Sequence, residues 1–510
     1  MKKYYIASLV ILFLIASCKK TNLEVNDQKD PEKFTTQQID AFIRQSIKVK
    51  HKFEWNAASD IMVWSALQES DHILSVGYKP ADEENVEDRV ASIDIRNLKW
   101  LTAKNEVLNL ILIEEQKLNK DIDLKNIIQW EETVLPVIDI YVKNLSTIQK
   151  LRASKLVRYA EPMGYEPIDV AAKVASSSGC GSNIAEPGLI ENIDYSVLLP
   201  ASKESWNYQY HNIPKAWVKS SGAGVKVFII DTGCEYDQEN LGSAFNQGYS
   251  SGRTVEKLVT LPRPTFLGIP TGPVETPDDG CGHGTSMAGA CAAPRGTDGA
   301  ICGVAFNCNL ITCRAAADVY LDESREVKGA SDAFTTAGNR ADVRIISMSM
   351  GKVTSSSQLT DAIRYAYGKG KLIFCAAGTS FSWTSGWYGV TFPATLSEVN
   401  AVTGVRDNQF QNTCTSCHSG SETDFTIVME KAANERHPLT LAMTGDAPST
   451  VGGSSVSTAT AAGIAALVWS KFPAMTRTQV LNKLIQSSSN YPTKNSLLGW
   501  GNINADVATN

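Results

Sequence analysis

The chain has 510 residues, more than one ordinary domain, and its hydrophobic fraction of 43% is ample for a large buried core. Its formal net charge of −6 gives no reason to expect nucleic-acid binding, which needs a basic surface. The sequence contains no internal repeat, no phosphate-binding glycine loop and no cysteine and histidine cluster with zinc-site context.

The first 17 residues predict an export signal. A short basic start precedes an apolar run over 6–17 that is too short to span a membrane comfortably. The run ends at Leu14-Ile-Ala-Ser-Cys18, which resembles a bacterial lipobox, where the cysteine is lipidated and becomes the first residue of the mature chain. This resemblance implies a protein anchored to a bacterial membrane through Cys18, in the periplasm or at the cell surface. An ordinary signal peptide with an incidental cysteine is the alternative.

The segments that follow differ in composition. Residues 18–34 are polar and charged, which suits a flexible tether. Residues 35–88 carry helix-like spacing of apolar residues, and we expect a helical segment whose role the sequence does not indicate.

Residues 89–166 predict a small α+β domain. The expected elements are a strand at 91–95, a helix at 101–117, a strand at 134–142, a helix at 145–153 and a strand at 156–162. Residues 167–200 are rich in turn-forming residues and predict a linker that proteases can attack. Residues 201–510 then form the main domain.

Two stretches of the main domain end in polar groups of catalytic type. Gly224–Gly233 is a run of β-forming residues that places Asp231 at the C-terminal tip of a buried strand, where open α/β sheets gather their catalytic groups. Asp278–Gly289 places His283 among glycines before a helix of small residues. Alone, such an acid is often a cap and such a histidine is usually a satisfied polar residue.

A third stretch, Val451–Trp469, supplies a candidate nucleophile. Paired glycines allow a tight turn, and the small and apolar residues beyond them predict a buried helix with Ser455 at its start. Unpaired backbone N–H groups there stabilise negative charge that develops on an attacked carbonyl. The commoner use of serine at this position is a helix cap.

Together the three stretches give an acid, a base and a nucleophile in the order Asp231, His283, Ser455. From about residue 205 to 508 the chain resembles the subtilisin-like serine peptidases. The resemblance implies an α/β fold with a largely parallel sheet and helices on both faces. It also implies an exported serine endopeptidase that cleaves peptides or proteins and is made as a self-processing precursor. In such an enzyme His283 takes the proton of Ser455, Asp231 fixes the histidine, and Ser455 forms the acyl-enzyme.

The resemblance also assigns the substrate-binding backbone, because Val343–Gly351 is similar to the family segment that pairs with an extended peptide. The residues expected to bind substrate are Ser347, Ser349, Met350, Gly351, Ala376, Ala377 and Gly378.

One residue departs from the family pattern at the oxyanion site. The family usually has asparagine after Ala-Ala-Gly, donating to the oxyanion beside the backbone N–H of Ser455. Here that residue is Thr379, whose hydroxyl has a shorter reach. Removing such a donor costs about 10²–10³ in turnover. A catalytically impaired, subtilisin-like peptide-binding protein is therefore the main alternative.

The same resemblance gives the N-terminal segments a role. Lys155–Gly164 is similar to the ends of subtilisin propeptides, which implies that 89–166 is a prodomain that assists folding and inhibits the enzyme; an unrelated α+β module is the alternative. Cleavage in 167–200 would separate the catalytic domain from the lipid anchor. Family members often bind structural calcium, although no site can be placed, and the chemistry requires no cofactor.

Ten cysteines remain besides Cys18, and an even number in an exported chain favours disulfides of unknown pairing. Cys291 and Cys375 lie in segments that we expect to be buried, and we expect them to be free. Cys414-Thr-Ser-Cys-His418 matches the c-type haem attachment pattern, which makes a haem protein a remote alternative. A local disulfide or incidental spacing is the other interpretation.

Overall fold

The structure is a computed structural model that describes residues 32–167, 180–181, 183–266, 269–380, 389–408 and 410–510. The expected signal peptide, Cys18, nearly all of the tether and residues 168–179 of the expected linker lie outside them. Residues Phe34–Asn510 form one compact unit. Within the described ranges, no helix is both long and apolar enough to cross a membrane.

The N-terminal part of this unit is an α+β domain with a four-stranded antiparallel sheet in the order β2-β3-β1-β4. Its strands are β1 (Ile73–Tyr78), β2 (Ile128–Glu131), β3 (Val137–Tyr141) and β4 (Val157–Pro162). Its helices are α1 (Thr36–Lys50), α2 (Asp60–Gln68), α3 (Val86–Arg89), α4 (Leu98–Glu115), α5 (Leu124–Ile127) and α6 (Leu145–Ala153), with 3₁₀ turns at Trp55–Ala57 and Val90–Ser92.

Two expectations for this domain are wrong. Residues 35–88 are not a separate helical segment, because β1 lies inside the sheet and pairs with both β3 and β4. The strand β1 could not be predicted because Ser75 and Gly77 interrupt its run of apolar residues. The strand expected at 91–95 is a 3₁₀ turn followed by a loop, because the Asp94 carboxylate accepts the Arg96 N–H at 3.1 Å and turns the chain.

The C-terminal domain is built on a seven-stranded sheet in which every neighbouring pair is parallel. In spatial order its strands are β15 (Thr423–Glu430), β14 (Asn400–Arg406), β13 (Leu372–Ala376), β12 (Val343–Met348), β7 (Lys226–Asp231), β11 (Asn309–Arg314) and β8 (Val255–Val259). The sheet confirms the expected α/β fold.

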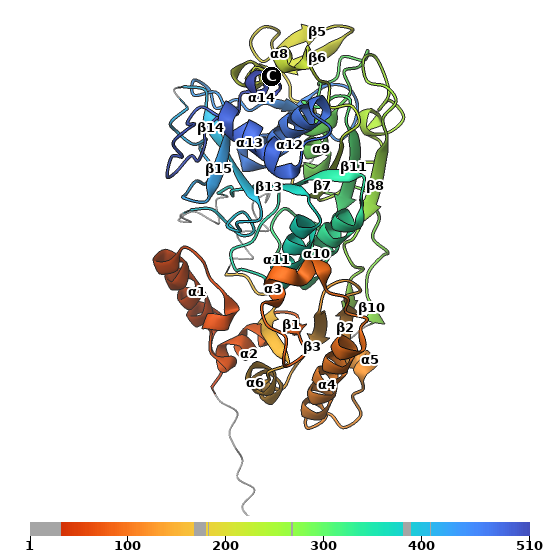
Figure 1. Cartoon of the computed structure of the whole chain (residues 1–510), viewed down its shortest axis with the longest axis vertical. Helices are drawn as coiled ribbons and strands as arrows, with labels where there is room; N and C mark the ends of the chain where they lie inside the picture. The colour runs from red at the N-terminus through yellow and green to blue at the C-terminus, as the bar shows by residue number, and fades with distance from the viewer. Residues whose placement is uncertain (1–31, 168–179, 182, 267–268, 381–388, 409) are drawn as a thin grey trace, which may run out of the picture. The chain divides into compact units, whose positions relative to one another are not determined.

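Helices cover both faces of this sheet (Figure 1). They are α8 (Ile213–Trp217), α9 (His283–Ala292), α10 (Ser324–Asn339), α11 (Ser357–Gly368), α12 (Gly453–Lys471), α13 (Arg477–Ser487) and α14 (Ala505–Ala508). Alternate residues of β7 explain the two layers: Val227 and Ile229 join the core under α9 and α12, while Phe228 and Ile230 join the core under α10 and α11.

The smaller elements of this domain lie outside the seven-stranded sheet. They are β5 (Tyr195–Leu198), β6 (Ser202–Ser205), β9 (Thr265–Phe266), β10 (Ile269–Pro270), β16 (Leu439–Thr440) and β17 (Ser449–Thr450), with 3₁₀ turns at Trp206–His211 and Glu239–Leu241. β5, which lies inside the expected linker, pairs with β6 of the expected main domain, and Cys180 forms a disulfide with Cys281. The described residues from Cys180 onward are therefore attached to the C-terminal domain instead of forming a free linker.

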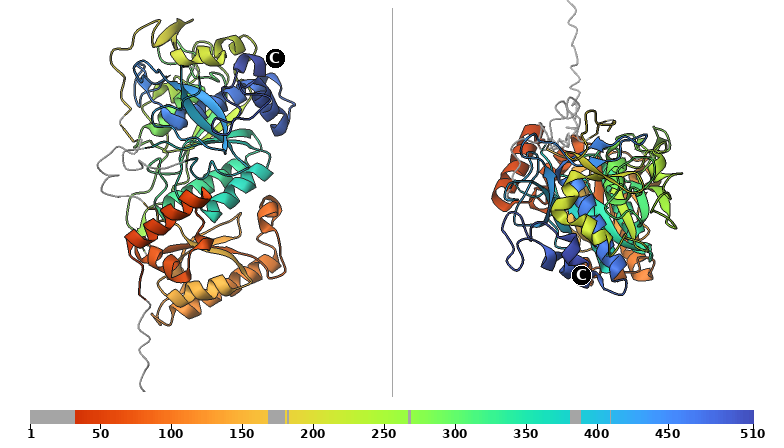
Figure 2. Two further views of the ribbon diagram at one scale, coloured as in Figure 1. Left: turned by 90° about the vertical axis from the view of Figure 1, so that its left-hand side faces the viewer. Right: turned by 90° about the horizontal axis from the view of Figure 1, so that it is seen from above.

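The N-terminal sheet packs on α10 and α11, which lie between the two sheets (Figures 1 and 2). Polar contacts cross the same interface: Arg158 donates two hydrogen bonds to Asp361, at 2.6 and 3.3 Å, and Glu161 accepts the backbone N–H and hydroxyl of Ser357 at the start of α11. The two domains thus share a continuous core.

Candidate active site

The turn after β7 holds an acid against a histidine. Asp231 is fully buried at the end of the strand, and its Oδ1 lies 2.7 Å from Nδ1 of His283, the first residue of α9. A side chain at Gly284 would collide with this turn, since a Cβ there would lie 2.3 Å from Gly233 O. Glycine therefore lets the start of α9 approach the strand end, which brings the two side chains together.

The hydrogen bond sets the state of the histidine. Because Nδ1 donates to Asp231, Nε2 of the neutral ring is left to accept a proton. Burial disfavours the imidazolium, but the charge and hydrogen bond of Asp231, with smaller contributions from Asp279 and Asp318, raise the pKa of His283 above its usual value. The ring is thus arranged as a base.

Ser455 lies in the first turn of α12, after Gly453 with its positive φ of 82°. Its hydroxyl donates to Ser349 O at 3.5 Å. In the part of the chain that the structure describes, no hydrogen bond joins Ser455 to His283. The serine and the histidine thus lie at the starts of two helices, and the serine hydroxyl is turned toward the segment after β12.

Thr379 follows β13 and contacts the start of α12. Its Oγ1 lies 3.0 Å from Ser454 Oγ, which also accepts the Gly378 N–H at 3.2 Å. A Cβ at Gly453 would lie 3.1 Å from the same threonine oxygen. Ser454, the residue before Ser455, thereby joins the segment after β13 to the start of α12, a role that the sequence did not indicate.

The Cys-x-x-Cys-His motif supports this segment from outside. Residues 416–418 run antiparallel to 378–380: Ser380 N donates to Ser416 O at 2.7 Å and His418 N donates to Gly378 O at 3.0 Å. Cys414 and Cys417 form a disulfide. The haem alternative is therefore wrong in this state, because thioether attachment needs both thiols.

The two ring nitrogens of His418 have different surroundings. Nε2 lies 2.6 Å from Ser380 Oγ, while the buried Nδ1 makes no hydrogen bond of ordinary geometry to any residue that the structure describes. Burial lowers the pKa of His418 to about 4, so the ring is neutral near pH 7.

A cavity of about 50 Å³ lies beside Ser455. It is lined by Val319, Tyr320, Ser349, Met350, Gly351, Lys352, Val353, Ala376, Gly378, Thr379, Thr391, His418, Ser454 and Ser455. Five of the seven residues expected to bind substrate are thus at this cavity.

The other two do not line the cavity. Ser347 is buried within β12, between β7 and β13. Ala377 uses its backbone within the domain, donating to Val402 O and accepting from Thr391 N, both at 2.9 Å. Ser347 lies just before Ser349, and Ala377 just before Gly378, both of which line the cavity. Their hydrogen bonds within the domain therefore fix the segments that form its wall.

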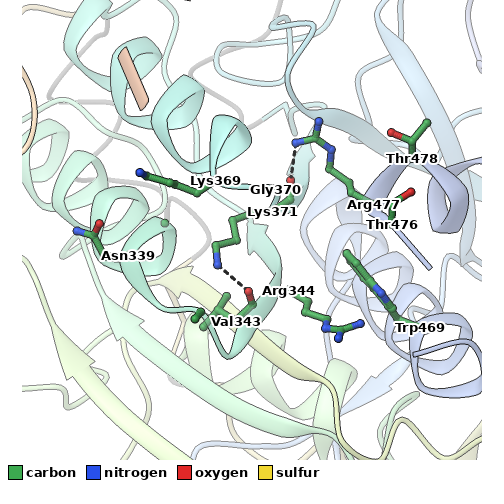
Figure 3. Close-up of a pocket in the computed structure, with 12 residues that line it drawn as sticks. Asn339, Val343, Arg344, Lys369, Gly370, Lys371, Trp469, Thr476, Arg477 and Thr478 are labelled. Atoms are coloured by element: carbon green, nitrogen blue, oxygen red, sulfur yellow. Dashed lines mark hydrogen bonds between the residues drawn. The ribbon is translucent and has the colours of Figure 1, made fainter. Parts of the chain in front are cut away.

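A larger cavity, of about 750 Å³, lies at the opposite edge of the sheet (Figure 3). Val343 and Arg344 begin β12 there, and Lys371 precedes β13, so the cavity faces the N-terminal ends of these strands. Asp231 and Gly378 follow the C-terminal ends, where parallel sheets place their sites.

The remaining cysteines and acids form no obvious site. Six buried cysteines carry no disulfide, and Cys291 and Cys375 are among them, as expected. Within the described ranges, no group of three or more histidine, cysteine, aspartate or glutamate side chains is placed to hold a metal ion.

Comparison with known proteins agrees with this geometry. Residues 222–501 match the family described as the subtilase family, peptidase S8. The chain is 24% identical over 306 residues to a subtilisin of Bacillus sp. (strain TA39), covering 57% of this chain and 67% of that protein. It is 28% identical over 287 residues to subtilisin DY of Bacillus licheniformis, covering 56% and 91%.

Among solved structures, MycP1 from Mycobacterium smegmatis is 22% identical, with a TM-score of 0.45, covering 62% of this chain and 88% of that one. The family match spans more than half of the sequence and contains Asp231, His283 and Ser455. The chain therefore belongs to the subtilase family and is a serine endopeptidase.

Proposed function

We propose that Asp231, His283 and Ser455 are the catalytic triad of this peptidase. The observation that carries the assignment is the 2.7 Å contact between Asp231 and His283 at the C-terminal edge of the parallel sheet, with Ser455 at the start of a neighbouring helix. The Ser455 hydroxyl breaks its hydrogen bond to Ser349 O, and its Oγ attacks the peptide carbonyl while Nε2 of His283 takes the hydroxyl proton. The imidazolium then protonates the leaving amine, and water hydrolyses the acyl-enzyme by the same route.

The oxyanion site follows from the order of hydrogen bonds around Ser454. The Gly378 N–H donates to Ser454 Oγ, so the serine hydroxyl is free to donate its own proton to Thr379 Oγ1. The Thr379 hydroxyl proton is then available to the oxyanion, together with the backbone N–H of Ser455. Thr379 thus takes the role that asparagine usually has in the family.

We propose further that the protein is a precursor. The N-terminal domain packs on α10 and α11 through the contacts of Arg158 and Glu161, as an intramolecular inhibitor that processing removes. Export and anchoring through Cys18 are supported by the sequence alone. Bound structural calcium is also a proposal, supported only by the family resemblance.

Intact mass spectrometry with a fluorophosphonate tests the assignment on the full chain. Wild-type protein should gain one adduct, and cleavage before Cys180 should remove the N-terminal domain; both should be absent from Ser455→Ala. A folded wild-type chain that takes no label would instead support the impaired peptide-binding protein.

A further inference from the structure

We propose that the catalytic domain carries a subsite for an acidic substrate side chain, on the N-terminal side of the cleaved bond, and that Glu166 of the N-terminal domain occupies it in this structure. The inference rests on the proposed function, because it concerns how the same active site selects peptides. Its evidence is the set of donors that surrounds one carboxylate.

Five donors of the catalytic domain converge on Glu166. Oε2 accepts the Tyr320 hydroxyl at 2.7 Å and the Val353 N–H at 2.8 Å. Oε1 accepts the Thr354 N–H at 3.2 Å and the Thr354 hydroxyl, and Lys352 Nζ lies 3.3 Å from it. The carboxylate is fully buried and Lys352 is 1% exposed. Charge-assisted bonds of this kind are about twice as strong as neutral ones.

The donors all belong to the catalytic domain, so they remain in place when the N-terminal domain, with Glu166, is removed. Both partners that the structure gives Lys352 Nζ, Glu166 Oε1 and Met163 O, come from the N-terminal domain. Departure of that domain leaves the ammonium group and the N–H groups of Val353 and Thr354 without these acceptors. A bound peptide that covers these donors again must supply acceptors, because unpaired buried donors are costly, and a buried cation more so. The vacated site therefore favours another carboxylate.

The carboxylate site and the catalytic serine share one cavity. Tyr320, Lys352 and Val353 line the cavity that Ser454 and Ser455 also line. From Ser349 to Val353 the segment spans four residues, roughly 13 Å of extended chain. A peptide that reaches both ends of this segment places its acidic residue a few positions from the bond under attack.

The direction of the chain indicates on which side of the cleaved bond the acidic residue lies. Glu166 lies at the acid site, and Cys180, later in the sequence, is bonded to Cys281, two residues before His283. The chain therefore reaches the acid site first and the histidine side second. A substrate that follows the same direction has its acidic residue before the cleaved bond.

The chemistry distinguishes glutamate from glutamine. Each oxygen of Glu166 faces at least one group that can only donate: the Val353 N–H at Oε2, and the Thr354 N–H and Lys352 ammonium at Oε1. In either orientation a glutamine amide would therefore place its N–H₂ group against such a donor. A site that hydrogen-bonds a substrate group rejects the analogue that leaves its buried groups unpaired. We expect about a tenfold or greater preference for glutamate in kcat/KM.

The test uses quenched fluorescent peptides that differ only by glutamate or glutamine, placed in turn at the second to sixth residue before the cleaved bond. Wild-type protein, purified as the full chain and used after whatever processing it undergoes, should prefer glutamate at one of these positions. Lys352→Met should abolish the preference and Thr354→Val should reduce it. Lys328→Met, which breaks a buried ion pair between Lys328 and Glu132 across the same interface but outside the cavity, should keep it.

Labelling of Ser455 separates the two levels of the proposal. Equal rates for glutamate and glutamine at every position, in an enzyme that takes the fluorophosphonate, overturn the subsite and leave the peptidase assignment intact. An enzyme that takes no label overturns the catalytic assignment and the subsite with it.

Glu166→Gln in the full chain gives an independent measurement that needs no substrate. This substitution should speed fluorophosphonate labelling, because it weakens the binding of the N-terminal domain to the donors at the cavity beside Ser455. Glu161→Gln, which weakens the contact with Ser357 outside the cavity, should speed labelling less. Equal labelling rates for Glu166→Gln and wild type overturn the proposal.

Discussion

Ser454 Oγ and Thr379 Oγ1 lie 3.0 Å apart; Ser454 directly precedes Ser455, and Thr379 lies three residues beyond the end of β13. Neither hydroxyl is free to turn independently, because Ser454 also accepts the Gly378 N–H. In the proposed mechanism the two hydroxyls act as one unit, in which Ser454 orients the hydroxyl proton that Thr379 would donate to the oxyanion.

The first prediction concerns this pair. Thr379→Val should lower kcat by about 10² with little change in KM, because it removes a donor that acts only in the transition state. Ser454→Ala should lower kcat by about tenfold, since Thr379 remains but is no longer oriented. If Ser454 acts through Thr379, the double variant should be no slower than Thr379→Val alone; additive losses would contradict this coupling.

The second prediction concerns the base. His283 accepts a proton only when neutral, so the labelling rate of Ser455 should fall as the pH drops through the pKa of His283. Asp231 raises that pKa, so Asp231→Asn should move the acid limb of the pH profile to lower pH. It should also lower kcat by about 10⁴, because the ring loses its fixed tautomer. An unmoved acid limb would assign it to another group.

A third prediction tests the disulfide between Cys414 and Cys417. Replacing both by serine should destabilise the domain by about 2 kcal/mol, as expected for opening a short closed loop. It should also slow labelling of Ser455, because residues 416–418 hold 378–380 in place. The test uses a background in which Cys180 and Cys281 are serine. In this background, a dithiol should slow labelling of the protein that keeps Cys414 and Cys417 and should not affect the protein in which both are serine. An equal effect of the dithiol on the labelling rates of these two proteins would refute the coupling.

The fourth prediction follows from Glu161. Burial raises the pKa of Glu161 to about 7, against the bonds from Ser357 that lower it. A carboxyl with a raised pKa binds its proton more tightly when folded, so folded protein should lose stability as the pH rises from about 4.5 to about 7. The Tm of full-length Ser455→Ala should fall over this range. Burial also raises the pKa of Asp139 to about 7, so Glu161→Gln should lessen the fall without removing it, whereas Glu84→Gln at an exposed residue should leave the fall unchanged.

Much of the site could be predicted because its residues sit at ends of elements that local sequence encodes. Asp231 ends a β-forming run, and His283 and Ser455 begin helices of small residues after glycine turns. Such patterns depend on neighbours in the chain.

What escaped prediction depends on distant residues. β1 belongs to the N-terminal sheet because β3 and β4 pair with it, not because of its own alternation, which Ser75 and Gly77 break. Glu166 is a single acid without a motif, and its partners lie more than 150 residues away. The role of Ser454 likewise needs the end of β13 beside it.

The bond between Cys180 and Cys281 divides the connecting segment into two kinds of cutting site. If the chain is anchored through Cys18, as proposed, a cut on the N-terminal side of Cys180 frees the catalytic domain from that anchor and leaves a short piece of the connecting segment bonded two residues from His283. A cut between Cys180 and Cys281 severs the backbone but leaves both pieces joined through sulfur, so the enzyme stays attached to whatever holds its first residue. Secretion of the free enzyme would then be decided by the position of the cut and by the oxidation state of this one bond.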